Sequence, residues 1–211
     1  RGWYAMIPQL GAPIGFILVA GLFAYLMSSL PRSDFYAWGW RYPFFVAFAI
    51  NVVALFARLR LVVTPEYSSM LKLRELVPSP VGELVRSQGR AIALGAFAPL
   101  ASYALFHLVT IFALSWALLF TKQSTISFLL VQFVGAAVAI PCMFLSGRIA
   151  DRFGRRMTLA VFGVLIAIYS GWTPLMLAGG TGESYLFIIV GFALLGFSHA
   201  QAAGAVNSSF L

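Results

Sequence analysis

Charged residues are scarce in this chain of 211 residues. Only 9% are charged, against about 25% in soluble domains, and six acidic residues face fourteen basic ones. A single cysteine, Cys142, excludes an internal disulfide and a cysteine-rich metal site. The two histidines stand far apart in sequence, at positions 107 and 199. A membrane-embedded enzyme would need acids and histidines clustered in one cavity, so we expect no enzyme, no metal and no cofactor.

Long apolar runs are what the chain has instead. It is 61% hydrophobic, with a mean hydropathy of +0.93. A membrane-spanning helix needs about 20 mainly apolar residues. Five of the runs exceed that length, and the second reaches it if Arg58 and Arg60 extend to the interface. The alternating polarity of membrane-barrel strands is missing. The sequence therefore predicts an all-α polytopic membrane protein with six transmembrane helices, within Trp3–Leu30, Tyr42–Ala57, Ala91–Thr121, Gln123–Gly147, Met157–Gly182 and Ser184–Leu211.

Basic residues are distributed unequally between the two sides of these six helices. Eleven fall on the side of residues 64–89 and 148–156, and three, Arg32, Arg41 and Lys122, fall on the other. The positive-inside rule places the eleven in the cytoplasm, with residues 32–41 and 178–183 outside. A basic chain can also bind nucleic acid, but that needs bases gathered on one solvated face. We expect the lipid bilayer as a partner and no nucleic acid.

One ten-residue segment, Gly147–Arg156, combines glycines, an acid and arginines in a fixed register. We expect Gly147 to begin a turn, with a second glycine after the acid and paired arginines at the end. The segment resembles the G-x-x-x-D-R-x-G-R-R/K loop of the major facilitator superfamily of secondary transporters. The resemblance implies a cytoplasmic gate motif, which in this sequence comprises Gly147, Asp151, Arg152, Gly154, Arg155 and Arg156.

Two further strings resemble one family within that superfamily, the metabolite:proton symporters. Trp38-Gly-Trp-Arg-Tyr-Pro-Phe44 is similar to the segment that precedes their sixth helix, and Arg58–Tyr67 to the segment that follows it. The second string departs from the family pattern, with Val63 in the place of a glutamate and Glu66 after Thr64-Pro65.

This register implies that the chain is a fragment covering helices five to ten of twelve. Residues 1–62 would then be the last two helices of the N-terminal bundle, and 63–89 the central cytoplasmic loop, with a short surface helix over Ser68–Val77. Residues 90–211 would be the first four helices of the C-terminal bundle.

The resemblance also implies a function. Such proteins are carriers of the bacterial inner membrane for carboxylates, betaines and similar small polar metabolites, and they work by alternating access with proton symport. We expect a small-molecule substrate, protons as co-substrate, and a monomer when the protein is complete. A uniporter or a drug exporter with the same fold stays open as an alternative. A channel would need a filter motif or a charged pore ring, and neither is evident.

Polar side chains inside the apolar runs are the candidates for the substrate path. Such groups lose hydrogen bonds in hydrocarbon unless they face protein or water. We expect the following six to share one aqueous cavity: Gln9, Tyr103, His107, Gln132, Gln201 and Asn207. His107 could alternatively make only a structural hydrogen bond. His107 and His199 are the two groups that titrate near neutrality. None of the six acids lies within a run, so we expect the coupling carboxylate, and the positive partner of any anion, elsewhere in the protein.

Asp151 needs a partner because it lies close to the bilayer among four arginines. The arginines themselves could serve. The superfamily's pseudo-twofold symmetry implies another partner, the helix start within Arg1–Met6, where unpaired N–H groups favour a carboxylate. That contact would act as a latch while the cytoplasmic side is closed.

Overall fold

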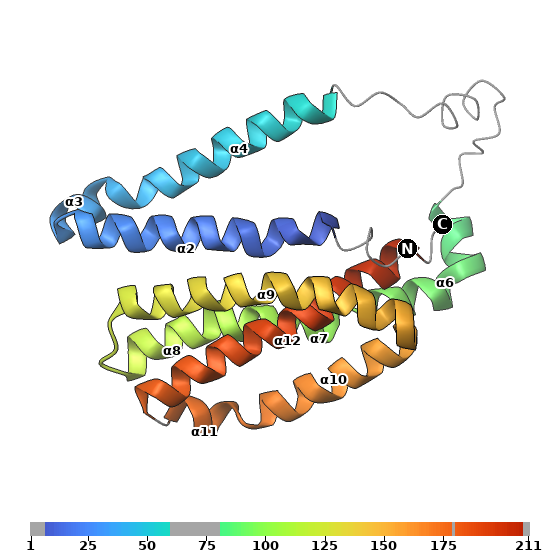
Figure 1. The fold of residues 1–211 in the computed structure, drawn as a ribbon. Helices are drawn as coiled ribbons and strands as arrows, with labels where there is room; N and C mark the ends of the chain where they lie inside the picture. The colour runs from blue at the N-terminus through green and yellow to red at the C-terminus, as the bar shows by residue number, and fades with distance from the viewer. Residues whose placement is uncertain (1–6, 60–80, 179, 209–211) are drawn as a thin grey trace.

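A computed structural model describes residues 7–59, 81–178 and 180–208, with side chains throughout except at 81, 83, 84, 91, 94 and 200–208. The described residues form helices and turns, with no strand among them (Figure 1). The first part comprises η1 (Ile7–Leu10), α2 (Gly11–Ser29), α3 (Arg32–Ala37), η2 (Gly39–Arg41) and α4 (Tyr42–Leu59). The second comprises α6 (Val81–Phe97), α7 (Leu100–His107), η3 (Leu108–Phe112), α8 (Ala113–Phe120), α9 (Thr125–Phe153), α10 (Arg155–Gly171), α11 (Thr173–Ala178) and α12 (Thr181–Ser208).

Five helical stretches among the described residues are long and apolar enough to cross a membrane. They confirm the prediction of an all-helical polytopic membrane protein, and they match the first four predicted spans and the last. They cover Ile7–Ser29, Gly39–Leu59, Gly95–Phe120, Thr125–Phe153 and Thr181–His199.

The predicted span Met157–Gly182 is not one continuous helix. It is divided between α10, of 17 residues, and the short α11. Pro174 has no N–H to donate to the preceding turn, and the backbone tightens just before it, where Trp172 N–H donates to Tyr169 O at 3.2 Å. The hydropathy of the run could not reveal this break, because the residues on both sides of it are equally apolar.

The third span also begins differently from the prediction. Its helical structure starts at Val81, inside the segment expected to be a loop up to Gly89. Gln88 then has non-helical backbone angles, φ −127° and ψ 19°, so the helix is kinked just before the apolar run. The surface helix expected over Ser68–Val77 lies outside the described residues.

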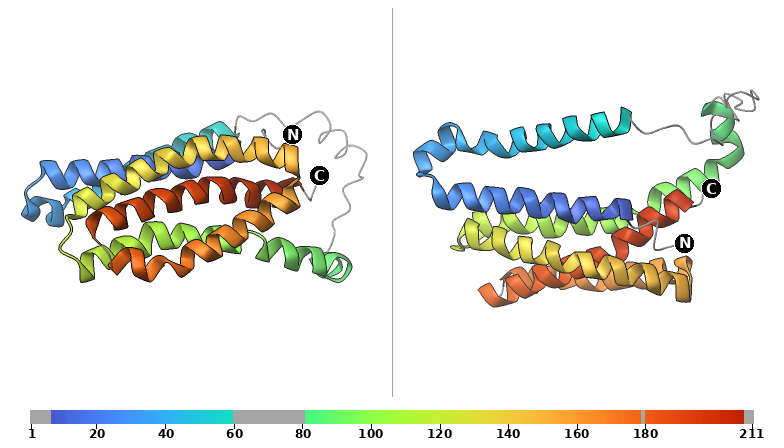
Figure 2. Two further views of the ribbon diagram at one scale, coloured as in Figure 1. Left: turned by 60° about the horizontal axis from the view of Figure 1, so that its bottom comes forward. Right: turned by 45° about the horizontal axis from the view of Figure 1, so that its top comes forward.

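Helix α12 lies at the centre of the second part, between α9 and α10, and it also contacts α7 (Figure 2). Glycines bring α9 and α12 together. A Cβ at Gly135 would stand 2.6 Å from the ring of Phe192, and one at Gly196 would clash with the carbonyl oxygen of Ala139. Small residues allow such close approach in membranes, where packing rather than water release drives helix association. The Gly135–Ala139 pair is therefore a packing surface.

Helix α2 packs along α9 and connects the first part of the chain to the second (Figure 1). Ala20 and Ala24 of α2 are buried, and a Cβ at Gly21 would lie 3.3 Å from the ring of Phe133 of α9. Helix α4 diverges from α2 beyond the α3 corner (Figures 1 and 2). Its large apolar side chains, such as Phe48 and Phe56, are exposed in this structure, as expected for a helix that meets lipid or other helices.

Candidate functional site: a substrate path between α2 and the second part

A cavity of about 300 Å³ lies where α2 meets α7, α9 and α12. We call it the aromatic cavity, because phenyl rings from three of these helices border it. Phe16 of α2 contacts Phe106 of α7 edge-to-face, with ring centroids 6.5 Å apart, and Phe192 of α12 at 5.5 Å. The full lining is Gln9, Ala12, Pro13, Phe16, Tyr103, Phe106, Ala139, Met143, Phe192, Leu195 and His199. A small metabolite would fit in this volume.

Three polar side chains reach the aromatic cavity from three different helical elements: Gln9 from η1, Tyr103 from α7 and His199 from α12. The imidazole of His199 is only 9% exposed, and the ring of Tyr103 meets it edge-to-face with centroids 5.3 Å apart. Tyr103 itself is 51% exposed, so the pair joins a buried group to an accessible one. The structure thus places two of the six predicted path residues, Gln9 and Tyr103, in one cavity.

His199 was recognised in the sequence as titratable but not as part of the cavity. The helical spacing of His199 to two apolar residues could have indicated its place in the cavity. Phe192, Leu195 and His199 stand at i, i+3 and i+7, which is one face of a helix. Since all three line the aromatic cavity, that apolar face ends in an imidazole directed at the same space.

Gln132 has a different role from the predicted one. Its side chain is 1% exposed and does not line the aromatic cavity. Instead, Nε2 donates to the carbonyl oxygens of Val109 and Thr110, both at 2.8 Å. These carbonyls belong to η3, a π-helix of five residues, in which the wider turn changes the backbone hydrogen bonding of an α-helix. The amide therefore ties α9 to the middle of the third span.

Of the other predicted residues, His107 does not line the aromatic cavity. His107 borders a separate shallow hollow on the surface of the third span, beside Leu108 and Ile111. It lies one turn from Tyr103, but the π-helix begins immediately after it. The side chains of Gln201 and Asn207 lie outside the described residues, and their place in the path stays a prediction.

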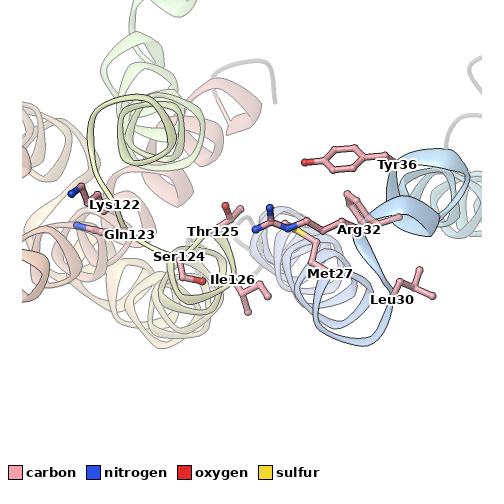
Figure 3. Close-up of a pocket in the computed structure, with 10 residues that line it drawn as sticks. Met27, Leu30, Arg32, Tyr36, Lys122, Gln123, Ser124, Thr125 and Ile126 are labelled. Carbon is pink, nitrogen blue, oxygen red and sulfur yellow. The ribbon is translucent and has the colours of Figure 1, made fainter.

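A second cavity, of about 470 Å³, lies at the opposite end of α2 and is called the outer cavity below. Figure 3 shows Arg32 extending from α3 toward the start of α9, near Thr125, with Tyr36 on the same side as Arg32. Lys122 also borders this cavity but points away from Arg32. The outer cavity is thus formed by the end of α2, the α3 corner, the loop before α9 and the start of α9, and it is separate from the aromatic cavity.

The gate motif is mostly helical, which corrects the expected turn at Gly147. Helix α9 continues through buried Gly147 to Phe153, and α10 begins at Arg155. Only Gly154 interrupts the two helices, with a φ of +86° that other residues rarely adopt. The seven residues Gly147–Phe153 can extend a helix as readily as they can form a loop, so the sequence could not place the turn within the motif.

Other interactions fix this tight corner. Thr158 is buried and its Oγ1 donates to the carbonyl oxygen of Gly154 at 2.9 Å, while the guanidinium of Arg152 lies over the ring of Phe153 at 5.4 Å. Asp151 is exposed in the last turn of α9. Its expected partner, the segment Arg1–Met6, lies outside the described residues, so the latch stays a prediction.

Comparison with known proteins decides the family. The model of the Major Facilitator Superfamily matches residues 2–210. The chain belongs to this superfamily. The members of this superfamily are transporters of small molecules, so the family found is a transporter family, as the sequence resemblance implies, and not an enzyme family.

Among curated proteins, the chain is similar to the "Inner membrane metabolite transport protein YhjE" of Escherichia coli, with 30% identity over 100% of this chain and 49% of that protein. It is also similar to the "Proline/betaine transporter" of Salmonella typhimurium, with 24% identity over 80% of this chain and 37% of that protein. The chain therefore spans about half the length of the first of these relatives, and the match to the second covers 37% of that protein. No solved structure matches it.

Proposed function

We propose that the transporter containing this chain carries a small polar metabolite, such as a carboxylate or a betaine, across the bacterial inner membrane by alternating access and proton symport. The observation that carries the proposal is the position of the aromatic cavity. It lies between α2 and the helices α7, α9 and α12, and the family resemblance of the sequence implies that α2 belongs to one bundle and the other three helices to the second. Transporters of repeated bundles bind their substrates at such an interface.

The chemistry of the lining supports this substrate class. Phenyl rings surround an amide, a phenol and an imidazole, so the cavity can hold an apolar body and bind a few polar groups. Relatives named as an inner-membrane metabolite transporter and a proline/betaine transporter support the same class and location. The complete protein acts as a monomer, because one pair of bundles encloses one path.

Uptake measurements test this proposal. The complete transporter, expressed in a bacterial strain that lacks endogenous carriers for the probes, is supplied with labelled carboxylates and betaines, with and without a protonophore. We expect accumulation of at least one probe that the protonophore abolishes. Uptake that only equalises the probe concentration on the two sides would indicate a uniporter, and accumulation that resists the protonophore would indicate another coupling ion. Export of the probes would contradict import altogether.

A further inference from the structure

We infer that His199 is the positive partner of a substrate carboxylate, so that a proton and an anion occupy the aromatic cavity together. This inference rests on the proposed function and assigns one residue to both substrate binding and coupling. It departs from the sequence-based expectation that the positive partner lies elsewhere in the protein.

The first argument is the charge inventory of the cavity. Its eleven lining residues include no acid, lysine or arginine. Tyr103 and His199 are the titratable groups among them, and only an imidazole gains a positive charge near neutral pH. An anion in a space bordered by phenyl rings loses its hydration and needs a compensating charge. Within this lining, a protonated His199 is what can supply it.

The second argument is the geometry of His199. Its ring is almost completely buried, yet it borders open space and meets the edge of the exposed Tyr103 ring. Among the described residues, no hydrogen bond is recorded that would occupy either ring nitrogen. Because the ring borders the cavity, a protonated ring nitrogen can donate to a ligand oxygen there.

The surrounding elements add no competing charge. The lining residues of η1 and α2 are neutral, as are those of α9. Cys142 of α9 lies next to Gly196 of α12, one turn from His199, and is not part of the lining. No described neighbour carries a negative charge that would neutralise an imidazolium, so a bound carboxylate is suited to that role. Charge balance then couples the two species.

The step is a binding equilibrium with a defined balance. One proton binds a ring nitrogen of His199, and one carboxylate binds the resulting imidazolium. Both leave on the other side of the membrane, and the imidazole is neutral again. For a monocarboxylate, the cycle moves no net charge. Uptake should therefore follow the pH gradient and not the membrane potential.

The test uses the complete transporter in liposomes, with labelled shikimate as a monocarboxylate probe and labelled glycine betaine as a probe with its own fixed positive charge. For shikimate, we expect the KM to rise about tenfold per pH unit above the titration range of the imidazole. His199→Gln should raise the KM at least tenfold at low pH and abolish its pH dependence. His199→Lys should keep shikimate binding and lose the pH dependence. Glycine betaine should respond less to either change.

Two controls separate this role from a structural one. His107→Gln removes the other imidazole of the chain, outside the aromatic cavity, and should keep the wild-type pH profile. Tyr103→Phe keeps the ring contact with His199 but removes the phenol from the cavity, so its KM can rise while the slope of KM against pH should stay that of the wild type. A wild-type pH profile in both His199 variants would overturn the inference while leaving the proposed function intact. Failure of the wild-type protein to transport either probe would contradict the proposed substrate class, and the inference with it.

Discussion

The two ends of the contact between α2 and α9 are built differently. Between the aromatic cavity and the outer cavity, Gly21 brings α2 directly against α9, because a Cβ there would lie 3.3 Å from the ring of Phe133. Near η1, the residues Ala12 and Pro13 border the aromatic cavity instead. Phe16 lies between the two ends along α2. Under the predicted orientation, the tight end faces outward and the cavity lies toward the cytoplasm.

This difference indicates where α2 and α9 can separate during transport. Close contact between helices in a membrane is stabilised by dispersion and is lost if they separate by even a small gap. The tight end is therefore a closed contact that must be broken to admit substrate from that side. The cavity end already offers space and polar groups. The experiments below test this contrast, in order of expected effect.

The largest effect should come from removing an aromatic ring that is fully buried in the core. Phe128 is 1% exposed within the core near the start of α9, so Phe128→Ala should lower the free energy of unfolding by about 3–5 kcal/mol. Phe16→Ala should cost clearly less, since its ring already faces empty space. Thermal unfolding in detergent measures both. Equal destabilisation by the two changes would argue that the cavity end is as well packed as the core.

Adding volume to the tight end should have the next largest effect. Gly21→Leu places side-chain atoms against the ring of Phe133 and should cost about 1–3 kcal/mol while reducing uptake. Gly15→Leu is the matched control on the same helix, because a Cβ there meets nothing within 4 Å among the described residues. Unfolding and uptake assays on the two variants measure whether the added volume is harmful only at the tight contact. If Gly15→Leu is the more harmful change, the tight contact has been misplaced.

A smaller effect should follow from breaking the link between α9 and η3. Gln132→Leu removes both hydrogen bonds to the π-helix carbonyls and should cost about 1 kcal/mol. Gln88→Leu, at an exposed amide, should be close to neutral. Since the same span carries Tyr103, the Gln132 variant should also raise the KM for substrate. An unchanged KM would show that the link does not position the cavity wall.

The last experiment determines which end of the α2–α9 contact faces outward, and its substitutions at exposed positions should leave the stability of the protein unchanged. In a Cys142→Ser background, single cysteines replace exposed Ser33 of α3 and exposed Arg152 of the gate motif. A membrane-impermeant thiol reagent added to intact cells should label position 33 and not position 152. Labelling of position 152 from outside would reverse the orientation, and the tight end would then face the cytoplasm.

Fold class and most span positions could be predicted from the sequence because they depend on apolar length and on basic residues at the ends. Hydropathy does not register single-residue backbone events, however. The break before Pro174 and the turn at Gly154 each depend on one or two residues inside a longer pattern. The gate motif was recognisable as a motif, but its conformation was not.

The candidate site was harder to predict, for a physical reason. A buried amide in an apolar span needs partners, and the sequence suggests water or substrate as the partner. For Gln132 the partners are backbone carbonyls of η3, and no sequence pattern indicated a π-helix there. Gln9 and Tyr103 both border the aromatic cavity, and their part in a substrate path stays a prediction. His199 was visible only through helical spacing to Phe192 and Leu195.

The π-helix at Leu108–Phe112 sets the rotational phase between two halves of one span. An α-helix advances about 100° per residue, so one additional residue in a widened turn rotates everything after it relative to everything before it. On one side of η3, Tyr103 is turned toward the aromatic cavity; on the other, the indole Nε1 of Trp116 donates to Leu177 O at 3.3 Å. Loss of a single residue between them would leave the span equally long for a bilayer and equally apolar. It could then satisfy only one of these two alignments.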